Sequence, residues 1–588
     1  MWLAPDETTN VPPSLVSNLN RHAAERSLDT ALTFLVDGDS RVSALTYGDL
    51  HTSALRIAAS LSAKVKPGGR VIVALPPGVA FVQAFFGCLF AGIVAVPVHA
   101  LRTNDSPQEM RRLDRIAASC EASCVLVNSA AMRHGQRFKE NHDFLGQLLW
   151  LEFEAVNGSR LDSAFEPSPE TIAFLQYTSG STSEPKGVIV THGGLAANFA
   201  AMAQSMAIDE SSVFLSWLPP SHDMGLIGNI LQAIFFGSGL VLMSPMHFLQ
   251  RPLRWLSAIG RYRATHSGGP SFAYDLCVRR TTPEQRTALD LRSWRLAFNG
   301  AEPVRADTME AFAAAFAASG FSRGAFLPCY GLAEATLYVS SPKCGEFPLV
   351  LSVDKKKLQS GIAVPAFGEE AIDIVSCGRP PAGHEIAIVD PDRCTPLPDG
   401  VIGEIWTRGP STASGYWALE TSTRATFMAQ LAGCDRHFMR TGDLGFRWDR
   451  GLYVTGRLKD LIILRGRNIY PQDIEFTIEQ SYDSVQPVGG AAFGESVNGE
   501  ERLVLVQEVR RGIVNDPDRL ARSIAQTILE QHEIQAHRVV LIRPGSLPKT
   551  TSGKIRRSAT RMVLAAGDLP VVAEYRHETL MAAVGGNA

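Results

Sequence analysis

The chain has 588 residues, of which 45% are hydrophobic and 20% charged, and its 56 lysines and arginines nearly balance its 59 aspartates and glutamates. This length excludes a single hydrophobic core and predicts a globular protein of at least two domains. The net charge of −3 excludes the strong positive field with which proteins attract nucleic acid or an anionic membrane.

The nine cysteines are scattered along the chain. Cys120 and Cys124 are the closest pair, and no second pair or histidine set completes a zinc site. This usage favours reduced thiols in a cytoplasmic protein. Residues 1–7, MWLAPDE, lack a basic region followed by an apolar one, so we expect no signal peptide.

Residues 79–98 form the first long apolar stretch, and a membrane-spanning helix is the alternative to a buried helix here. Gln83, Gly87, Gly92 and Pro97 interrupt the stretch, and a strand-like apolar run at 71–75 precedes it. We therefore predict a βαβ unit whose parallel strands are buried on both faces, and no membrane span.

Residues 178–187, TSGSTSEPKG, carry hydroxyls, glycines and one lysine between the apolar runs 172–175 and 188–190. We predict a hairpin-like element whose loop turns backbone N–H groups, hydroxyls and Lys186 toward a polyphosphate. The loop is not a Walker A motif, because Gly187 and a strand follow the lysine. An ordinary Ser/Thr-rich surface turn is the alternative.

Strand-like runs at 125–127, 240–243 and 385–389 alternate with amphipathic helical stretches, which predicts an α/β architecture with layered sheets. A boundary falls near residues 456–460. Beyond it we expect a small α+β unit with a helix starting at Pro471, strands at 503–506 and 538–542, and a helix that presents Leu520, Ile524 and Ile528 on one face.

Four further segments follow the Ser/Thr-rich loop: 328–336 (PCYGLAEAT), 441–445 (TGDLG), 456–463 (GRLKDLII) and 547–557 (LPKTTSGKIRR). In this order and spacing they closely resemble the core motifs of the acyl-adenylate-forming enzymes, over about residues 40–560. Segments 217–226 (WLPPSHDMGL) and 466–475 (GRNIYPQDIE) resemble one branch, the fatty acyl-AMP ligases. The chain departs from many members at Ser183, where they have glycine and a freer backbone.

The resemblance implies a large N-terminal adenylation domain of several subdomains with layered sheets, residues 1–457, and a small mobile C-terminal lid, residues 458–588. It implies ATP and Mg²⁺ as cofactors. Joining a carboxylic acid to ATP requires no enzyme nucleophile, because the carboxylate oxygen attacks the α-phosphorus, and catalysis comes from positioning and preorganised charge. The lack of a GxSxG elbow or a Cys/His pair agrees with this chemistry.

The resemblance also implies which residues bind the nucleotide. Asp443 would accept both ribose hydroxyls and Arg457 would add a donor there; an Asp-Leu-Gly turn is the alternative for Asp443. Tyr330 would stack on adenine, with core packing as its alternative. The remaining nucleotide contacts would come from the phosphate loop and from the wall opposite Tyr330: Thr178, Ser179, Gly180, Ser181, Thr182, Lys186, Gly300, Ala301 and Glu302.

Further roles implied by the resemblance concern catalysis. Glu334 would help to hold Mg²⁺, unless it is a solvated surface glutamate. Lys554 would bridge the acyl carboxylate and the α-phosphate, with Lys549 as a solvated flank. His222 would border the carboxylate end of the acyl site, unless it is a packed or capping residue. Met224 would face the acyl tunnel, with core filling as an equally good interpretation.

Residues 345–374 make an unusually long connection at the place where fatty acyl-AMP ligases carry an insertion that CoA ligases lack. In that family the insertion is thought to hinder the lid arrangement that admits CoA. A loop without a functional role is the alternative. Lys459 is the expected hinge. We expect an enzyme that makes a fatty acyl adenylate and passes the acyl group to an acyl carrier protein, or to a carrier domain of a polyketide or peptide synthase. A fatty acyl-CoA ligase and a catalytically silent nucleotide or lipid sensor remain alternatives.

Overall fold

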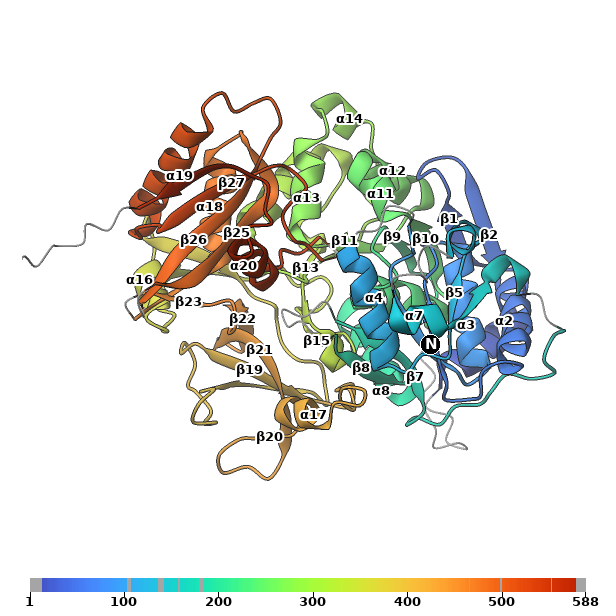
Figure 1. Cartoon of the computed structure of the whole chain (residues 1–588). Helices are drawn as coiled ribbons and strands as arrows, with labels where there is room; N and C mark the ends of the chain where they lie inside the picture. Colours follow the sequence, from blue (N-terminus) through green and yellow to red (C-terminus); the bar gives the residue numbers. More distant parts are fainter. Residues whose placement is uncertain are drawn as a thin grey trace, which may run out of the picture. The chain divides into compact units, whose positions relative to one another are not determined.

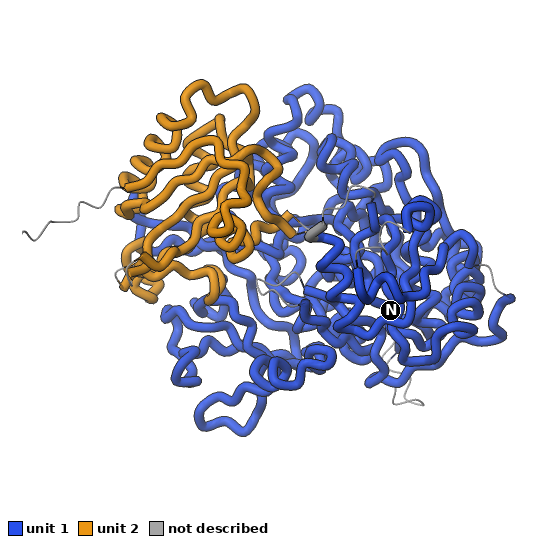
Figure 2. Tube along the Cα trace, in the orientation of Figure 1, with its two compact units in different colours: residues 1–353, 365–454 blue, residues 354–364, 455–588 orange. Residues whose placement is uncertain are grey.

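The computed structural model describes residues 13–102, 107–135, 142–156, 159–178, 185–464, 466–497, 500–550 and 553–577. The chain forms two compact units, residues 1–353 with 365–454 and residues 354–364 with 455–588 (Figure 2). From the sequence, we predicted a domain boundary after residue 457 and placed the whole insertion, residues 345–374, in the first domain. The structure divides the chain after residue 454 and groups 354–364 with the second unit.

The first sheet of unit 1 has six strands in the order β6 (Leu149–Glu152), β5 (Cys124–Val127), β3 (Arg70–Val73), β4 (Val94–Pro97), β7 (Ile172–Tyr177) and β8 (Gly187–Thr191). The predicted βαβ unit is confirmed, because β3 and β4 are parallel and α3 (Val79–Phe90) connects them. The predicted hairpin is also confirmed, because β7 and β8 pair antiparallel. No helix among the described residues is long and apolar enough to cross a membrane.

Alternating side chains bury both faces of this sheet. Val71 and Val73 pack into one core with α2 (Tyr47–Ser62) and α3, whereas Ile72 packs into another core with α4 (Pro107–Ser119). This period of two explains why the strands read as continuous apolar runs. The short helices α5 (Ser129–Arg133) and α7 (Asp143–Gln147) contribute Ala131 and Leu145 to the second core.

The second sheet has seven strands in the order β13 (Phe326–Pro328), β12 (Leu296–Asn299), β11 (His266–Gly269), β9 (Val213–Ser216), β10 (Gly239–Met243), β1 (Thr30–Leu35) and β2 (Val42–Thr46). It shares one apolar core with the first sheet, so the two form layers of an α/β fold (Figure 1). Its helices are α8 (His192–Met206), α10 (Gln232–Phe236), α11 (Pro245–Gln250), α12 (Leu253–Tyr262), α13 (Ser271–Arg279), α14 (Pro283–Thr287) and α15 (Ala306–Phe316).

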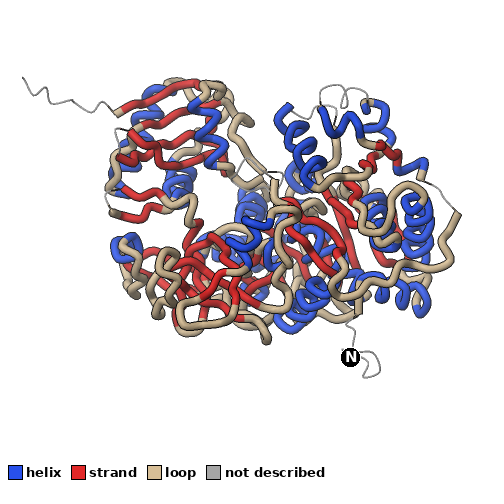
Figure 3. The backbone as a smooth tube through the Cα atoms, turned by 60° about the horizontal axis from the view of Figure 1, so that its bottom comes forward, coloured by secondary structure: helices blue, strands red, loops and turns tan. Residues whose placement is uncertain are grey.

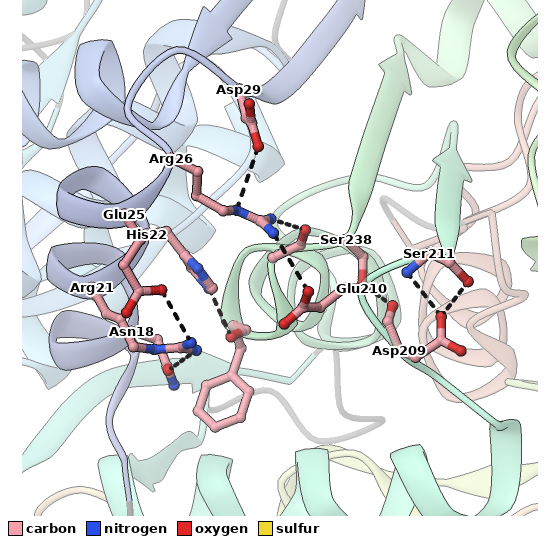
Figure 4. Close-up of polar contacts among 12 residues, drawn as sticks. Asn18, Arg21, His22, Glu25, Arg26, Asp29, Asp209, Glu210, Ser211 and Ser238 are labelled. Atoms are coloured by element: carbon pink, nitrogen blue, oxygen red, sulfur yellow. Dashed lines mark hydrogen bonds and ion pairs between the residues drawn. The ribbon is translucent and has the colours of Figure 1, made fainter. Parts of the chain in front are cut away.

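Polar contacts attach the N-terminal helix α1 (Leu15–Glu25) to the end of α10 (Figure 4). The His22 ring nitrogen Nε2 lies 3.3 Å from the carbonyl oxygen of Phe235. Arg26 donates to the carbonyl of Gly237 and lies 3.8 Å from Asp29 and 3.9 Å from Glu210. These contacts fix α1 against the second sheet.

A third sheet of unit 1 has the strands β18 (Glu385–Val389), β19 (Gly403–Arg408), β21 (His437–Trp448), β20 (Ala429–Gln430) and β22 (Gly451–Arg457), beside α17 (Glu420–Phe427). The boundary between the two units falls within β22, after residue 454. Two further sheets have two strands each: β14 (Tyr330–Gly331) pairs with β15 (Tyr338–Ser340), and β16 (Val350–Asp354) pairs with β17 (Ala371–Val375).

The second unit is built on a four-stranded sheet of β25 (Val485–Val497), β26 (Glu500–Val509), β27 (Arg538–Ile542) and β28 (Val571–Arg576). Leu503 and Leu505 face a core with α18 (Pro471–Ser481) and α19 (Pro517–His532), and Val504 and Val506 face a core with α20 (Arg557–Ala565). The unit also holds the hairpin of β23 (Ile462–Leu464) and β24 (Arg467–Ile469) and the helix α16 (Lys355–Gln359). The helices and strands predicted here from the sequence are confirmed (Figure 3).

Candidate active site

Three of the predicted site residues of unit 1 follow parallel strands of the second sheet. Gly300 comes directly after β12, Tyr330 follows β13, and His222 follows β9. The Cys329 N–H donates to the Asn299 carbonyl over 2.8 Å, which holds the first two of these segments side by side. The carboxyl edge of parallel strands is where open α/β sheets bind ligands.

Tyr330 and Asp443 meet at this edge. The Tyr330 hydroxyl donates to Oδ2 of Asp443 over 2.8 Å, and the exposed fractions of the two residues are 8% and 6%. Asp443 belongs to strand β21, so the contact joins the β14–β15 hairpin to the third sheet. A phenol and a carboxylate placed together in this way offer a flat apolar ring beside a hydrogen-bond acceptor.

Glu404 supports the irregular segment of β21 that carries Asp443. Its carboxylate is 2% exposed and accepts from Trp406 Nε1 at 2.9 Å and from the Gly442 N–H at 3.1 Å. Arg440 Nη2 lies 2.6 Å from the same carboxylate and balances its charge. Gly442 has φ +71°, which suits glycine, so this segment of β21 is fixed by its backbone and by the buried carboxylate together.

The wall predicted opposite the tyrosine has a constrained backbone. A Cβ on Gly300 would lie 2.6 Å from the Cys329 carbonyl oxygen, so only glycine permits this approach. Ala301 has φ +69°, a left-handed conformation that costs energy for a residue with a Cβ. Oε1 of Glu302 accepts from the Phe272 N–H at 3.1 Å.

Glu334 and Lys186 are connected through a residue that sequence reasoning did not single out, Tyr416. The Tyr416 hydroxyl donates to Oε1 of Glu334 over 2.8 Å, and Lys186 Nζ lies 4.8 Å from the centre of the Tyr416 ring. Burial, with the neighbouring Glu334 carboxylate, raises the pKa of Tyr416 above its ordinary value of 10.0, so the phenol keeps its proton. The structure therefore brings together a cation, a phenol and a carboxylate.

The phosphate loop is described only at its two ends. The Thr178 N–H donates to the Lys186 carbonyl over 3.2 Å, which closes the hairpin, and Arg112 Nη2 donates to the Thr178 carbonyl over 3.4 Å. The other predicted phosphate-binding residues, Ser179, Gly180, Ser181 and Thr182, lie outside the described residues.

His222 and Met224 begin an irregular helical stretch. His222 Nδ1 lies 2.6 Å from Oδ1 of Asp223, and the side chains are 19% and 14% exposed. Met224 is half-buried and packs against the shared core of unit 1. Residues 226–231 then form a π-helix, a distortion that often marks functional sites. His222 also acts as a capping residue, as the alternative interpretation expected, because its Nδ1 accepts from the Met224 N–H over 3.4 Å.

Lys554 belongs to the second unit and sits on a hairpin turn. The Thr550 N–H donates to the Lys554 carbonyl at 2.7 Å, and the Lys554 N–H donates to Thr550 Oγ1 at 3.0 Å. Lys549, expected as a solvated flank, is exposed, and its Nζ also lies 3.5 Å from Oε2 of Glu508, which is 3% exposed. The Glu508 carboxylate also accepts from the Leu547 N–H at 2.8 Å and so anchors the hairpin.

A half-buried arginine, Arg557, fixes the other end of this hairpin. Arg557 donates to both carboxylate oxygens of Glu475, at 2.7 and 2.6 Å, and to Oδ2 of Asp460 at 2.9 Å. Asp460 lies in the turn that follows β22 and that also contains Lys459, and both Lys459 and Arg457, the last residue of β22, are exposed. The Lys554 loop and the predicted hinge are therefore joined through one guanidinium within the second unit.

Part of the predicted insertion is bound to the second unit. Oε1 of Gln359 accepts from Arg467 Nε at 3.0 Å and from Nη2 at 2.6 Å. Lys355 Nζ donates to the Gln531 carbonyl at 2.8 Å, and Lys356 Nζ lies 3.5 Å from Oε1 of Glu533. Asp354 caps α16 by accepting from the Lys357 N–H at 2.8 Å.

The donor chemistry at Glu334 suits magnesium. A single carboxylate completed by phosphate oxygens and water is a common way for proteins to bind Mg²⁺. Within the described ranges, no group of three or more His, Cys, Asp or Glu side chains could hold a metal ion.

Sequence reasoning missed Tyr416, Glu404, Glu508 and Arg557. Their partners lie far away in the sequence, so no local motif connects them. Tyr416 and Glu334, for example, are 82 positions apart. One signal was available for Arg557, because it directly follows the LPKTTSGKIR run that carries Lys554.

Two family models match the chain. The model described as AMP-binding enzyme matches residues 19–417, and the model described as Disco-interacting protein 2-like, AMP domain, matches residues 459–573.

Curated and solved relatives resemble nearly the whole chain. A medium-chain-fatty-acid–[acyl-carrier-protein] ligase, JamA of Moorena producens, is 41% identical over 95% of this chain and 96% of its own length. The crystal structure of a fatty acid AMP ligase from Legionella pneumophila has a TM-score of 0.74 at 40% identity, covering 96% of this chain and 98% of that one. A crystal structure of a fatty acyl-adenylate ligase from L. pneumophila, in complex with acyl adenylate and pyrophosphate, has a TM-score of 0.73 at 39% identity, with the same coverage of both chains.

Proposed function

The chain belongs to the family of AMP-binding enzymes, among its fatty acyl-AMP ligases, and we propose that it activates a medium- or long-chain fatty acid with ATP and passes the acyl group to a carrier protein. The observation that supports this most directly is the placement in unit 1 of Tyr330 against Asp443, and of Glu334 and Lys186 on either side of Tyr416. The names of relatives similar over almost the entire length support the substrate class.

The proposed reaction has two steps. A carboxylate oxygen of the fatty acid attacks the α-phosphorus of ATP, the bond from that phosphorus to the bridging oxygen breaks, and pyrophosphate leaves. The phosphopantetheine sulfur of the carrier then attacks the acyl carbon of the adenylate, the bond to the AMP oxygen breaks, and the thiol proton passes to solvent. Both steps depend on positioning and on neutralised charge.

For the phosphates, we assign Lys186 and the loop 178–182 to the β- and γ-phosphates and Glu334 to Mg²⁺. A bound magnesium ion would neutralise charge on the phosphate oxygens. For the adenosine, we assign stacking on the base to Tyr330, the facing wall to Gly300, Ala301 and Glu302, and the ribose hydroxyls to Asp443 and Arg457.

For the acyl group, we assign the carboxylate end of the site to His222 and the hydrocarbon tunnel to Met224. Lys554 neutralises the charge that grows between the carboxylate and the α-phosphate. Lys459 serves as the hinge of the lid. Its place in an exposed turn, next to the Asp460 carboxylate that binds Arg557, supports this assignment.

The acceptor of the acyl group is proposed to be a thiol presented on an acyl carrier protein or on a carrier domain of a polyketide or peptide synthase, rather than CoA. The contacts of α16 with Arg467 and Gln531 support a restraining role of the insertion. We propose a cytoplasmic location, because all nine cysteines lie among the described residues and are unpaired, as is usual in a reducing compartment.

A direct experiment supplies ATP, Mg²⁺ and a medium- or long-chain fatty acid to the full chain and then adds either CoA or a phosphopantetheinylated carrier protein. We expect acyl-AMP that stays bound, little CoA thioester, and discharge by the carrier. Removing residues 354–361 should raise thioester formation with CoA without raising adenylation. Rapid acyl-CoA production by the intact chain would instead identify a fatty acyl-CoA ligase, and a lack of ATP–pyrophosphate exchange would identify a silent sensor.

A further inference from the structure

Tyr416 is the residue through which Lys186 and Glu334 are connected. Its hydroxyl donates to Glu334 over 2.8 Å and its ring centre lies 4.8 Å from Lys186 Nζ. Tyr416 itself is 7% exposed. A hydrogen bond to a charged acceptor is stronger than one between neutral groups, and an ammonium over an aromatic face is attracted by the ring.

The backbone of Tyr416 is tied to the strand that leaves the phosphate loop. The Ile189 N–H donates to the Gly415 carbonyl over 2.9 Å, and the Trp417 N–H donates to the Gly187 carbonyl over 2.8 Å. Tyr416 itself forms an antiparallel bridge with Val188. The segment 415–417 therefore continues the first sheet beyond β8 and keeps the tyrosine in register with Lys186.

Local contacts then fix the direction of the side chain. The Tyr416 N–H donates to Thr423 Oγ1 over 2.9 Å, and the Tyr416 ring meets the Phe427 ring edge to face with centres 5.2 Å apart. Gly415 has φ +143°, and a Cβ there would lie 2.4 Å from Cγ2 of Thr423, so glycine is required for this close approach.

We propose that Tyr416 is a positioning residue for the metal–nucleotide complex. Its hydroxyl orients the Glu334 carboxylate toward the phosphate-bound magnesium, and its ring holds the Lys186 ammonium toward the phosphates. The inference rests on the roles of Glu334 and Lys186 in the proposed function. A carboxylate anchored through one oxygen can present the other in few directions, which lowers the entropy lost when it binds a cation. Partners of metal-ligating carboxylates typically contribute about 10- to 100-fold to metal affinity or activity.

Two substitutions separate the hydroxyl from the ring. Tyr416→Phe removes only the donor to Glu334, and Tyr416→Leu also removes the aromatic face under Lys186. Tyr482→Phe is a matched control, because it removes a tyrosine hydroxyl that contacts Thr527 at 2.7 Å elsewhere in the chain.

The measurement is isothermal titration calorimetry of ATP binding to the full chain, once with excess Mg²⁺ and once with EDTA. For Tyr416→Phe we expect the Kd of ATP to rise about tenfold with Mg²⁺ and to stay unchanged with EDTA. The Mg²⁺ concentration for half-maximal pyrophosphate exchange should rise by a similar factor. Tyr416→Leu should also weaken binding in EDTA, by about two- to fivefold, and Tyr482→Phe should change neither value.

An equal loss with and without Mg²⁺ in Tyr416→Phe, or no loss at all, would overturn the role of the hydroxyl. Unchanged EDTA binding in folded Tyr416→Leu would overturn the role of the ring. Glu334→Gln distinguishes these failures from failure of the proposed function. If Glu334→Gln binds ATP and Mg²⁺ normally, the assignment of Glu334 is wrong; if it weakens binding while Tyr416→Phe does not, only the inference about Tyr416 is wrong. Thermal unfolding of each variant shows whether Tyr416→Leu is folded, and Tyr416→Phe alone decides the role of the hydroxyl.

Discussion

The hydroxyl of Tyr330 donates a 2.8 Å hydrogen bond to Asp443, 113 residues further along the chain. The contact joins a residue that follows one sheet to a residue within another, and both are buried. It therefore couples the orientation of an aromatic ring to that of a carboxylate. In the proposed function, these are the groups that recognise the base and the ribose.

Tyr330→Phe should raise the KM for ATP by about 5- to 10-fold and change kcat less, because it keeps the ring and loses one hydrogen bond to a charged group. Steady-state pyrophosphate exchange at varied ATP measures both constants. A fall in kcat with unchanged KM would place the hydroxyl in the chemical step instead.

Lys554→Ala should slow adenylation at least about 10²-fold, the scale for removing one preorganised charge-stabilising donor. Pyrophosphate exchange measures this rate, and circular dichroism checks the fold. Arg561→Ala is the control, because it removes an exposed cation from the neighbouring helix α20 and should have little effect. Near-normal exchange by Lys554→Ala would exclude the proposed role.

Lys459→Pro should spare adenylation and impair acyl transfer, because proline fixes φ at the turn where the lid is proposed to rotate. Lys459→Ala, which leaves φ free, should retain both half-reactions. The two steps are measured as pyrophosphate exchange and as discharge of bound acyl-AMP by carrier protein. Equal loss of both in the proline variant would argue against a hinge at this residue.

Gln359→Ala should increase CoA thioester formation several-fold without raising adenylation, because it removes the acceptor that binds Arg467 through two N–H groups. Lys356→Ala provides a matched comparison on the same helix. Its ion pair with Glu533 is exposed, at 59% and 62%, and such pairs contribute little. Mass spectrometry of acyl-CoA quantifies the result, and similar behaviour of the two variants would contradict a restraint through Gln359.

Acid should destabilise unit 1 through its buried histidines. Burial lowers the pKa of His266 from 6.5 to about 4 and that of His192 likewise to about 4. Their contribution to stability is complete above pH 6.5 and is lost as the pH falls toward 4, because the unfolded chain binds protons that the folded chain does not. Proton uptake on unfolding in guanidinium at about pH 5 should fall by about one proton in His266→Gln and again in His192→Gln. Unchanged uptake in the single variants would contradict the shifts.

Local patterns were enough to predict most elements of the fold. Continuous apolar runs gave β3, β4 and β5, and the four-residue spacing of Leu520, Ile524 and Ile528 gave α19. Such elements were predictable because their signal depends on neighbours within one turn or one strand.

The residues that support the site could not be predicted, because their partners are distant in the sequence. In the sequence, Glu404 is an ordinary acidic residue of a strand. In the structure, it is buried and accepts hydrogen bonds from Trp406 and Gly442. The ion-pair partner of the exposed Lys549 is Glu508, a buried carboxylate of strand β26 that lies 41 positions earlier in the sequence. Each role depends on a partner that only the tertiary fold brings close, and local sequence patterns do not predict such long-range contacts.

The grouping of residues 354–364 with the second unit changes how that unit is connected to the rest of the chain. The backbone passes from one unit to the other after residues 353, 364 and 454, so three covalent connections link them instead of one. A lid on a single connection can swivel about almost any axis, whereas a lid on three must move so that none of them is stretched. Any motion of the second unit as the proposed lid is therefore limited by chain topology, and cutting the backbone within 354–364 would remove that limit without removing a single side chain.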